Sequence, residues 1–209
     1  MTKKKATAKS DHIKVIFVEG DADEIIIDKL MSYYRSYGFK KQIKTINTHG
    51  FPDEKKMRQG LTKIIMCSKN PVEFEAVVCE YDTDIFEKGI QQEPDWKKVE
   101  KNLKLNHNVT RFCRIQAKTS IEDWMLDDFE GLLKALSLPL NTQPKGQHGQ
   151  DKVKDLFRRK NIVYDRHKGK TKIMPIIDKL DIAKIRAARK EELKEFEKLL
   201  EVKIEKKSN

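Results

Sequence analysis

The chain has 209 residues, of which 38% are apolar and 37% charged, and its formal net charge is +11. This length and apolar content fit one domain with at most a small appendage, and no apolar run approaches the roughly 18 residues that a membrane span needs. The basic excess, to which lysines near both ends of the sequence contribute, favours a polyanionic partner, either nucleic acid or an anionic membrane surface.

The three cysteines, Cys67, Cys79 and Cys113, have no paired spacing and lie in or beside apolar runs. We therefore expect reduced core thiols, as in proteins of a reducing compartment. The basic start lacks the apolar segment and cleavage site of a signal peptide. Together these features predict a soluble, cytoplasmic protein that does not enter a membrane.

Strand and helix patterns alternate along the chain. Runs rich in β-branched residues predict strands, and apolar stripes at helical spacing predict helices. The expected strands are 12–20, 41–50, 74–84 and 109–119. The expected helices are 21–38, 52–70 (with Pro52 at its start), 93–106 and a long amphipathic helix at 120–138. This order predicts an α/β fold with a mostly parallel sheet of about four strands flanked by helices.

The chain also divides by composition. Residues 1–11 form a basic tail that we expect to be disordered, and residues 12–140 form the main domain. The segment NTQPKGQHGQ, residues 141–150, is typical of a linker. Residues 151–209 then predict a basic, helical C-terminal extension packed on the same domain, with helices at 151–164 and 180–201. Nothing in the sequence indicates an oligomeric state.

Acidic residues follow three of the four expected strands. Glu19 ends the first strand, Asp82 and Asp84 end the third, and Glu122 follows the fourth. In an open parallel sheet, ligands bind beyond the carboxyl ends of the strands, where these side chains would meet. Clustered carboxylates do not easily stay ionised together without cations, and hard oxygen ligands suit Mg²⁺ or Mn²⁺. The pattern therefore predicts one or two such ions at this edge.

Structural roles are open for several of these acids. Asp21, Asp23 and Glu24 lie in a helix's first turn, where the helix dipole favours negative charge and where Asp21 could be the N-cap. Asp82 and Asp84 are two residues apart, so in extended backbone they point the same way and could share a metal. Glu122 could instead close a capping box with Thr119.

The spacing of the first acids resembles that of a known family. Glu19-Gly20-x-x-Asp23 after a first strand, followed by Asp82-x-Asp84 after a later strand, resembles the Toprim domain over roughly residues 12–140. Topoisomerases, bacterial-type primases, ribosomal-RNA maturases and OLD-family nucleases share that domain, which has a Rossmann-like fold.

A second segment extends the resemblance. TSIEDWMLDD, which contains Ser120, Glu122 and Trp124, is similar to the Ser-x-Glu segment of small standalone Toprim proteins related to the OLD-family nucleases. The segment GKT at 169–171 lacks the upstream glycine of a complete P-loop, because Tyr164 occupies that position. We therefore expect no ATPase in this chain, and the resemblance implies a separate ATPase subunit as a partner.

The resemblance implies a role for each acid. Glu19 would be a general base or metal ligand, and Asp82 and Asp84 would chelate Mg²⁺. Asp23 and Glu122 would help to hold a second ion. A late lysine would stabilise charge in the transition state; Lys168, Lys170 and Lys172 are the candidates, and we take Lys170 as catalytic.

These observations favour a metal-dependent nuclease that hydrolyses DNA or RNA phosphodiesters through a Toprim carboxylate centre. By resemblance, such an enzyme suits phage or mobile-element defence. Two alternatives stay open. One is a non-catalytic Toprim scaffold that binds nucleic acid or a protein partner, and the other is an RNA-maturing Toprim ribonuclease.

Overall fold

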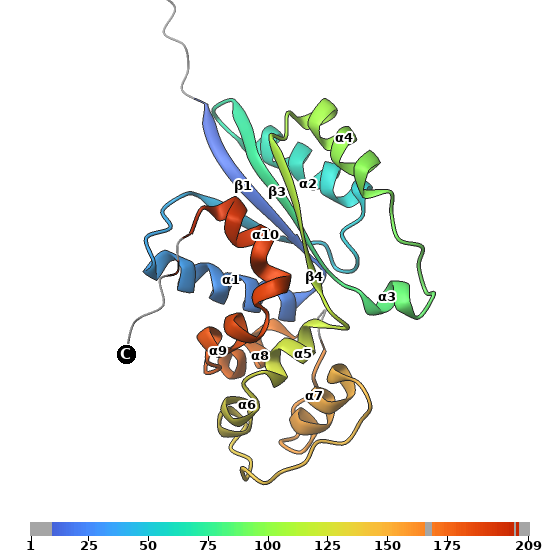
Figure 1. Ribbon diagram of the computed structural model, residues 1–209, viewed down its shortest axis with the longest axis vertical. Coiled ribbons are helices and arrows are strands. Elements are labelled where there is room, and N and C mark those ends of the chain that lie inside the picture. Colours follow the sequence, from blue (N-terminus) through green and yellow to red (C-terminus); the bar gives the residue numbers. More distant parts are fainter. Residues whose placement is uncertain (1–9, 166–168, 203, 205–209) are drawn as a thin grey trace, which may run out of the picture.

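Four parallel strands form one sheet at the centre of the computed structural model, which describes residues 10–165, 169–202 and 204. The strands are β1 (Asp11–Val18), β2 (Ile43–Asn47), β3 (Val72–Asp82) and β4 (Arg111–Ala117). Their order across the sheet is β2-β1-β3-β4, so β2 and β4 are its edges (Figure 1). The predicted α/β fold with a four-stranded, mostly parallel sheet flanked by helices is confirmed, and every pairing is parallel.

Helices connect the strands, as parallel pairing requires. The connections contain α1 (Asp21–Ser36), α2 (Glu54–Cys67), the short α3 (Asp84–Glu87) and α4 (Trp96–His107). The side chain of Asp53 accepts a hydrogen bond from the Lys56 amide and caps α2. Because Asp53 is the cap, the helix begins two residues after Pro52, the predicted first residue.

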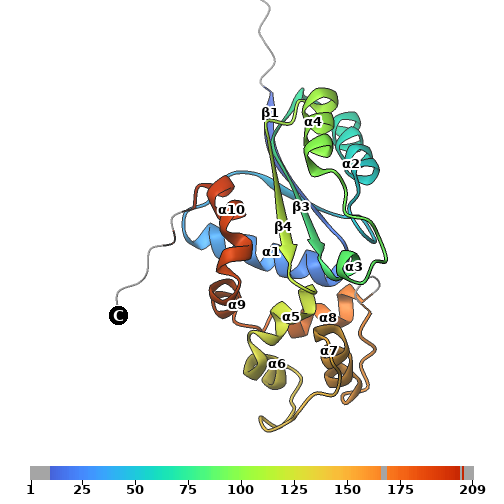
Figure 2. The same cartoon turned by 45° about the vertical axis from the view of Figure 1, so that its right-hand side comes forward.

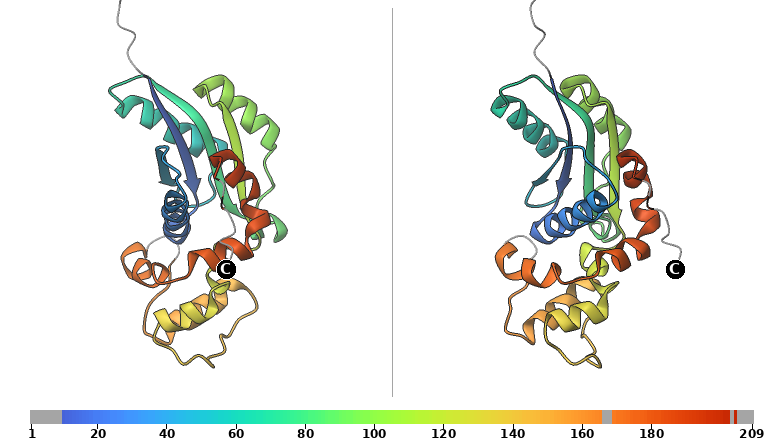
Figure 3. Two further views of the ribbon diagram at one scale, coloured as in Figure 1. Left: turned by 60° about the vertical axis from the view of Figure 1, so that its left-hand side comes forward. Right: turned by 90° about the vertical axis from the view of Figure 1, so that its left-hand side faces the viewer.

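The two faces of the sheet carry two separate hydrophobic clusters. On β1, Val15 and Phe17 pack toward α2 and α4, whereas Ile16 and Val18 pack toward α1. This alternation is the period of two that side chains follow along a strand. Figure 3 shows α2 and α4 on one side of the sheet and α1 on the other. Fully burying each large apolar side chain contributes roughly 1.5–3 kcal/mol.

A layer of short helices lies beyond the carboxyl ends of the strands (Figures 1 and 2). It contains α5 (Ile121–Leu126), α6 (Phe129–Ala135), α7 (Gly149–Arg158), α8 (Lys170–Ile177) and α9 (Ile182–Ala188). The last helix, α10 (Lys190–Leu200), returns along β4. Apolar residues of α8, α9 and α10 belong to the same cluster as those of α1 and of one sheet face.

The long helix expected at 120–138 is wrong, because α5 ends at Leu126 and α6 begins at Phe129. Polar contacts with the C-terminal region hold the break. Asp127 pairs with Arg189, and the buried Asp128 carboxylate accepts a hydrogen bond from the Asp181 amide. These partners lie more than fifty residues away in the sequence, so the local apolar pattern of 120–138 could not predict them.

Other boundaries also differ from expectation. The helix predicted at 180–201 is divided into α9 and α10 at Arg189, and α8 was not predicted. The helix α7 begins at Gly149, inside the segment expected to be a linker.

The cysteines agree with expectation in part. Cys79 and Cys113 are buried thiols, as predicted, but Cys67 is exposed at the end of α2. No helix in the described part of the chain is long and apolar enough to cross a lipid bilayer.

Candidate metal centre

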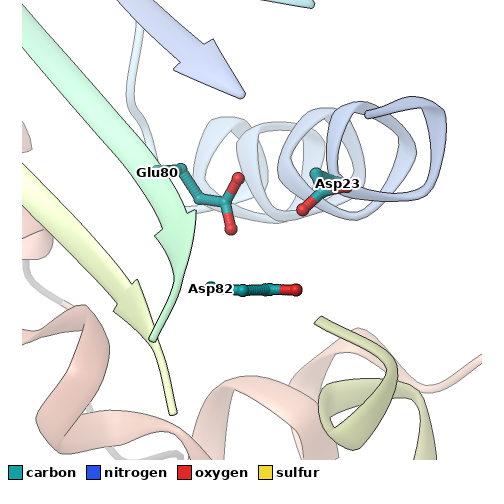
Figure 4. Close-up of side chains that lie close together, drawn as sticks. All are labelled: Asp23, Glu80 and Asp82. Carbon is teal, nitrogen blue, oxygen red and sulfur yellow. The ribbon is translucent and has the colours of Figure 1, made fainter. Parts of the chain in front are cut away.

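Three carboxylates meet where β3 ends against the start of α1. Asp23, Glu80 and Asp82 are each fully buried, and one oxygen from each lies within 4.8 Å of the others. Figure 4 shows Glu80 and Asp82 projecting from β3 toward Asp23 on α1. The group lies at the carboxyl edge of the sheet, where ligands bind in folds of this class.

Strand periodicity brings two of these acids to one side. Ala76 and Val78 belong to the row of β3 that packs toward α1, and Glu80 and Asp82 continue that row at the same spacing of two. We expected this spacing to pair Asp82 with Asp84. The strand ends at Asp82, however, so the pair that shares a direction is Glu80 and Asp82.

Asp84 lies outside this group among the described residues. It is the first residue of α3, and its carboxylate forms an ion pair with Lys88 one helical turn later, at 2.7 Å. Helical backbone does not continue the alternation of a strand, so Asp84 takes a different direction from Asp82. Glu80, which the sequence reasoning did not name as a site residue, occupies the place expected of Asp84.

Glu19 borders the group on the β1 side. It is 4% exposed, and its Oε1 lies 3.4 Å from the Asp82 amide nitrogen, which donates a long hydrogen bond to it. Burial, and then the negative charges of Glu80 and Glu19, raise the pKa of the nearby Cys79 thiol. The predicted convergence of acids from the first and third strands is therefore present in the structure.

The start of α5 holds one oxygen of Asp82. The Ile121 amide donates to Asp82 Oδ1 at 2.9 Å. This contact takes one of the free amides at a helix N-terminus and orients the carboxylate.

Glu122 is fully buried beside this contact but points to another partner. Tyr164 donates its hydroxyl hydrogen to Glu122 Oε1 at 2.9 Å, and Oε2 has no hydrogen-bond partner within the described residues. The capping box with Thr119 does not form, because Ser120 is the N-cap residue of α5 and its side chain makes no cap bond. Glu122 is thus a buried acid next to the group rather than part of it.

Lys170 is engaged away from the three carboxylates. Its Nζ forms an ion pair with Glu24 at 2.6 Å, and the side chain is 43% exposed. Asp21 Oδ2 accepts from the Gly169 and Lys170 amides, both at 3.0 Å, so it caps α8 and not its own helix, whose N-cap is Gly20. Lys172 is exposed on α8, and Lys168 lies outside the described residues.

The donor set suits a hard divalent cation. At the roughly 2.1 Å bond length of Mg²⁺, ligand oxygens in an octahedron lie about 3 Å apart when adjacent and about 4 Å apart when opposite. The Asp23, Glu80 and Asp82 oxygens lie within 4.8 Å of one another, so small side-chain rotations would bring them toward this geometry. Three carboxylates so close together repel one another, and a divalent cation would offset most of that charge.

Comparisons with known proteins give no relative. No protein-family model, curated protein or solved structure matches the chain. The geometry of the site therefore has to support any functional proposal by itself.

Proposed function

We propose that this protein is a metal-dependent nuclease that hydrolyses phosphodiester bonds of nucleic acid at the centre formed by Asp23, Glu80 and Asp82. The observation that supports the proposal most is the convergence of three buried carboxylates at the carboxyl edge of a parallel sheet. Such a set suits Mg²⁺ or Mn²⁺, the ions that commonly serve phosphoryl transfer. The net charge of +11 suits a polyanionic substrate.

Each residue has a role in this proposal. Asp23, Glu80 and Asp82 would hold the cation, which would activate water and polarise the phosphoryl oxygen. The Ile121 amide fixes the direction of the Asp82 carboxylate before substrate binds. Glu19, buried beside Asp82, would accept the proton of the attacking water.

The experiment that tests the proposal compares cleavage of labelled single-stranded and double-stranded DNA and RNA with Mg²⁺ or Mn²⁺. We expect Asp82→Asn and Glu80→Gln to lose cleavage, whereas Glu130→Gln, a change at an exposed ion-paired residue of α6, keeps it. Asp84→Asn separates the two geometries. If cleavage survives in that variant, Glu80 and Asp82 form the metal pair; if it is lost, the pair expected from the sequence is right.

One observation favours a second candidate, the scaffold that binds nucleic acid or a protein without cutting. Asp84 and Lys170, two of the residues expected to act in catalysis, are both held in ion pairs. A scaffold would bind nucleic acid equally well as wild type and as Asp82→Asn, and would cut nothing. Cleavage confined to RNA would instead favour the RNA-maturing ribonuclease.

A further inference from the structure

The outer edge of the sheet at β4 is an open site. Within the described residues, β4 pairs with β3 alone. A groove of about 1050 Å³ runs along β4 from Lys118 and Thr83 to Thr110. Figure 2 shows β4 between α4 on one side and α10 on the other, and residues of both helices line the groove. A strand edge in a groove of this kind is suited to pairing with an added strand.

The wall formed by α4 is aromatic and basic. Trp96 stacks on Phe112 of β4 with ring centroids 6.1 Å apart, and the Arg114 guanidinium lies over the Trp96 ring at 5.1 Å. Lys97 and Lys104 continue this wall along α4, where Glu100 also lines the groove and pairs with Lys104 at 2.7 Å. A side chain that faces this wall meets positive charge and a flat aromatic surface, which suits acidic or aromatic residues.

The wall formed by α10 is mostly acidic and partly apolar, with three glutamates and one lysine, Lys198, which lies 4.0 Å from Glu195. Glu191 and Glu195 have side chains that are 80% and 68% exposed, and Cys113 and Leu199 line the groove beside them. Glu192 lines the groove too, but it accepts hydrogen bonds from the Lys118 amide and the Trp124 indole. A side chain that faces this wall would be basic or apolar.

We propose that the free edge of β4 binds an extended segment of a partner protein whose residues alternate between basic or apolar and acidic or aromatic. The side chains of a strand point to opposite faces in turn. A segment paired with β4 would therefore place one set of residues against Glu191 and Glu195, and the other set against Trp96, Arg114 and the α4 lysines. Backbone pairing provides affinity, and the two unlike walls provide the sequence preference.

A second copy of the chain fits this edge less well. Pairing β4 with β4 through a twofold axis would place α10 beside α10 and α4 beside α4. Glu191 and Glu195 would then face the same acids, and Lys97 and Lys104 would face the same lysines. Like charges in such positions oppose association. A nucleic-acid strand is also disfavoured, because its phosphates would run along the acidic α10 wall.

The test uses a peptide as long as the 7 residues of β4. The probe is fluorescein-labelled Lys-Glu-Val-Tyr-Lys-Glu-Val, and its control has the same residues in the order Lys-Lys-Glu-Glu-Val-Val-Tyr. Fluorescence anisotropy with the full chain should show binding of the alternating peptide and weaker binding of the control. Because the assay measures binding alone, its result does not depend on the proposed nuclease activity.

Charge reversal on α10 then tests whether its acidic side chains contact the bound peptide. Glu191→Lys with Glu195→Lys should weaken binding of the alternating peptide by about fivefold, as expected for two exposed ion pairs. The matched control, Glu73→Lys with Glu130→Lys, makes the same change of net charge at exposed sites outside the groove and should leave binding unchanged. A peptide with glutamate in place of both lysines should prefer the charge-reversed variant over the wild type.

Three outcomes would overturn the proposal. They are no binding of the alternating peptide, equal binding of the two peptides, and equal weakening by the two charge-reversed pairs. Displacement of the peptide by a single-stranded oligothymidylate, with oligonucleotide binding lost in Trp96→Ala, would assign the groove to nucleic acid instead. All four charge changes are at exposed residues, and circular dichroism establishes that each variant is folded.

Discussion

Buried acidic residues at the carboxyl edge of the sheet and in the helical layer differ in what their carboxylates face. Asp23, Glu80 and Asp82 face one another. Asp128, by contrast, faces the Asp181 amide at 2.7 Å and the Lys184 ammonium at 3.1 Å. Repulsion among the three converging acids works against folding, whereas each contact of Asp128 stabilises the fold.

This difference separates two roles for buried charge. An acid with its own donor ties one element to another, as Asp128 ties the start of α6 to the start of α9. Acids that converge on each other place several negative charges close together, and their arrangement suits an added cation. Substitutions in the two groups should therefore move activity and stability independently.

The largest expected effect is on cleavage. Asp82→Asn keeps an oxygen that can accept from the Ile121 amide but removes a charge from the group, so cleavage should fall by about a thousandfold or more. Mn²⁺ at ten times its dissociation constant should raise the free energy of unfolding of the wild type by about 1.4 kcal/mol. Thermal unfolding measures this increment, which should disappear in Asp82→Asn.

Asp128→Asn is the control for that measurement, because it leaves the converging acids intact. It should keep both cleavage and the Mn²⁺ increment. Loss of the increment in both variants would show that Mn²⁺ acts on general stability, which would contradict a site at Asp82.

The second effect is on stability. Asp128→Ala removes a 2% exposed carboxylate and leaves the Asp181 amide and the Lys184 ammonium without this acceptor, which should cost about 2–4 kcal/mol. Glu130→Ala, two residues away, loses only an exposed pair with Lys134 and should cost less than about 0.5 kcal/mol. Urea unfolding measures both free energies. Equal losses would refute a special role for Asp128.

A pH dependence follows from the same carboxylate. Burial alone would raise the pKa of Asp128, but hydrogen bonds from the Asp181 amide and the Lys184 side chain outweigh burial and hold the pKa below its ordinary value of 3.8. The ionised group therefore stabilises the fold fully above pH 3.8, and this contribution is lost as the pH falls through the folded-state pKa. The stability difference between wild type and Asp128→Asn should shrink below pH 3.8 and stay constant above pH 5.

A smaller effect on stability is expected at Asp21. It lies on the same helix as Asp23, but like Asp128 it accepts hydrogen bonds from backbone amides of another element. Asp21→Ala removes the acceptor of the Gly169 and Lys170 amides and should destabilise α8 by about 1 kcal/mol. Asp21→Asn keeps an acceptor oxygen and should cost less. Hydrogen exchange of the α8 amides measures this local loss of stability, and the exchange rates of the α6 amides should not change.

The sequence predicted the sheet and its carboxyl edge well, because the apolar rows of β1 and β3 are local patterns with a period of two. The same reasoning brought Glu19 and Asp82 to one edge, whereas Asp23 was expected there only from the resemblance. It chose Asp84 over Glu80 because it extended β3 by two residues. Glu80 could have been found from its spacing to Val78, which continues the α1-facing row.

The helical layer was predicted less well for a physical reason. Its helices are short, and its breaks depend on contacts between residues far apart in the chain, such as Asp127 with Arg189 and Asp21 with the Lys170 amide. Propensity and periodicity are properties of neighbouring residues, so they do not report such contacts. The role of Lys170 was uncertain for the same reason.

The smallest expected effect on stability is at Lys170, and it tests whether this lysine belongs with the structural contacts or with the catalytic centre. Its pair with Glu24 is partly exposed, so Lys170→Ala and Glu24→Ala should each cost only about 0.5 kcal/mol. If Lys170 acts only in this pair, both variants should cleave nucleic acid equally well. If it moves to the substrate phosphate, Lys170→Ala should lose cleavage while Glu24→Ala, which frees the ammonium, should keep or increase it. Cleavage rates of the two single variants and the double variant therefore decide between the two roles, because a catalytic lysine makes the double variant as inactive as Lys170→Ala.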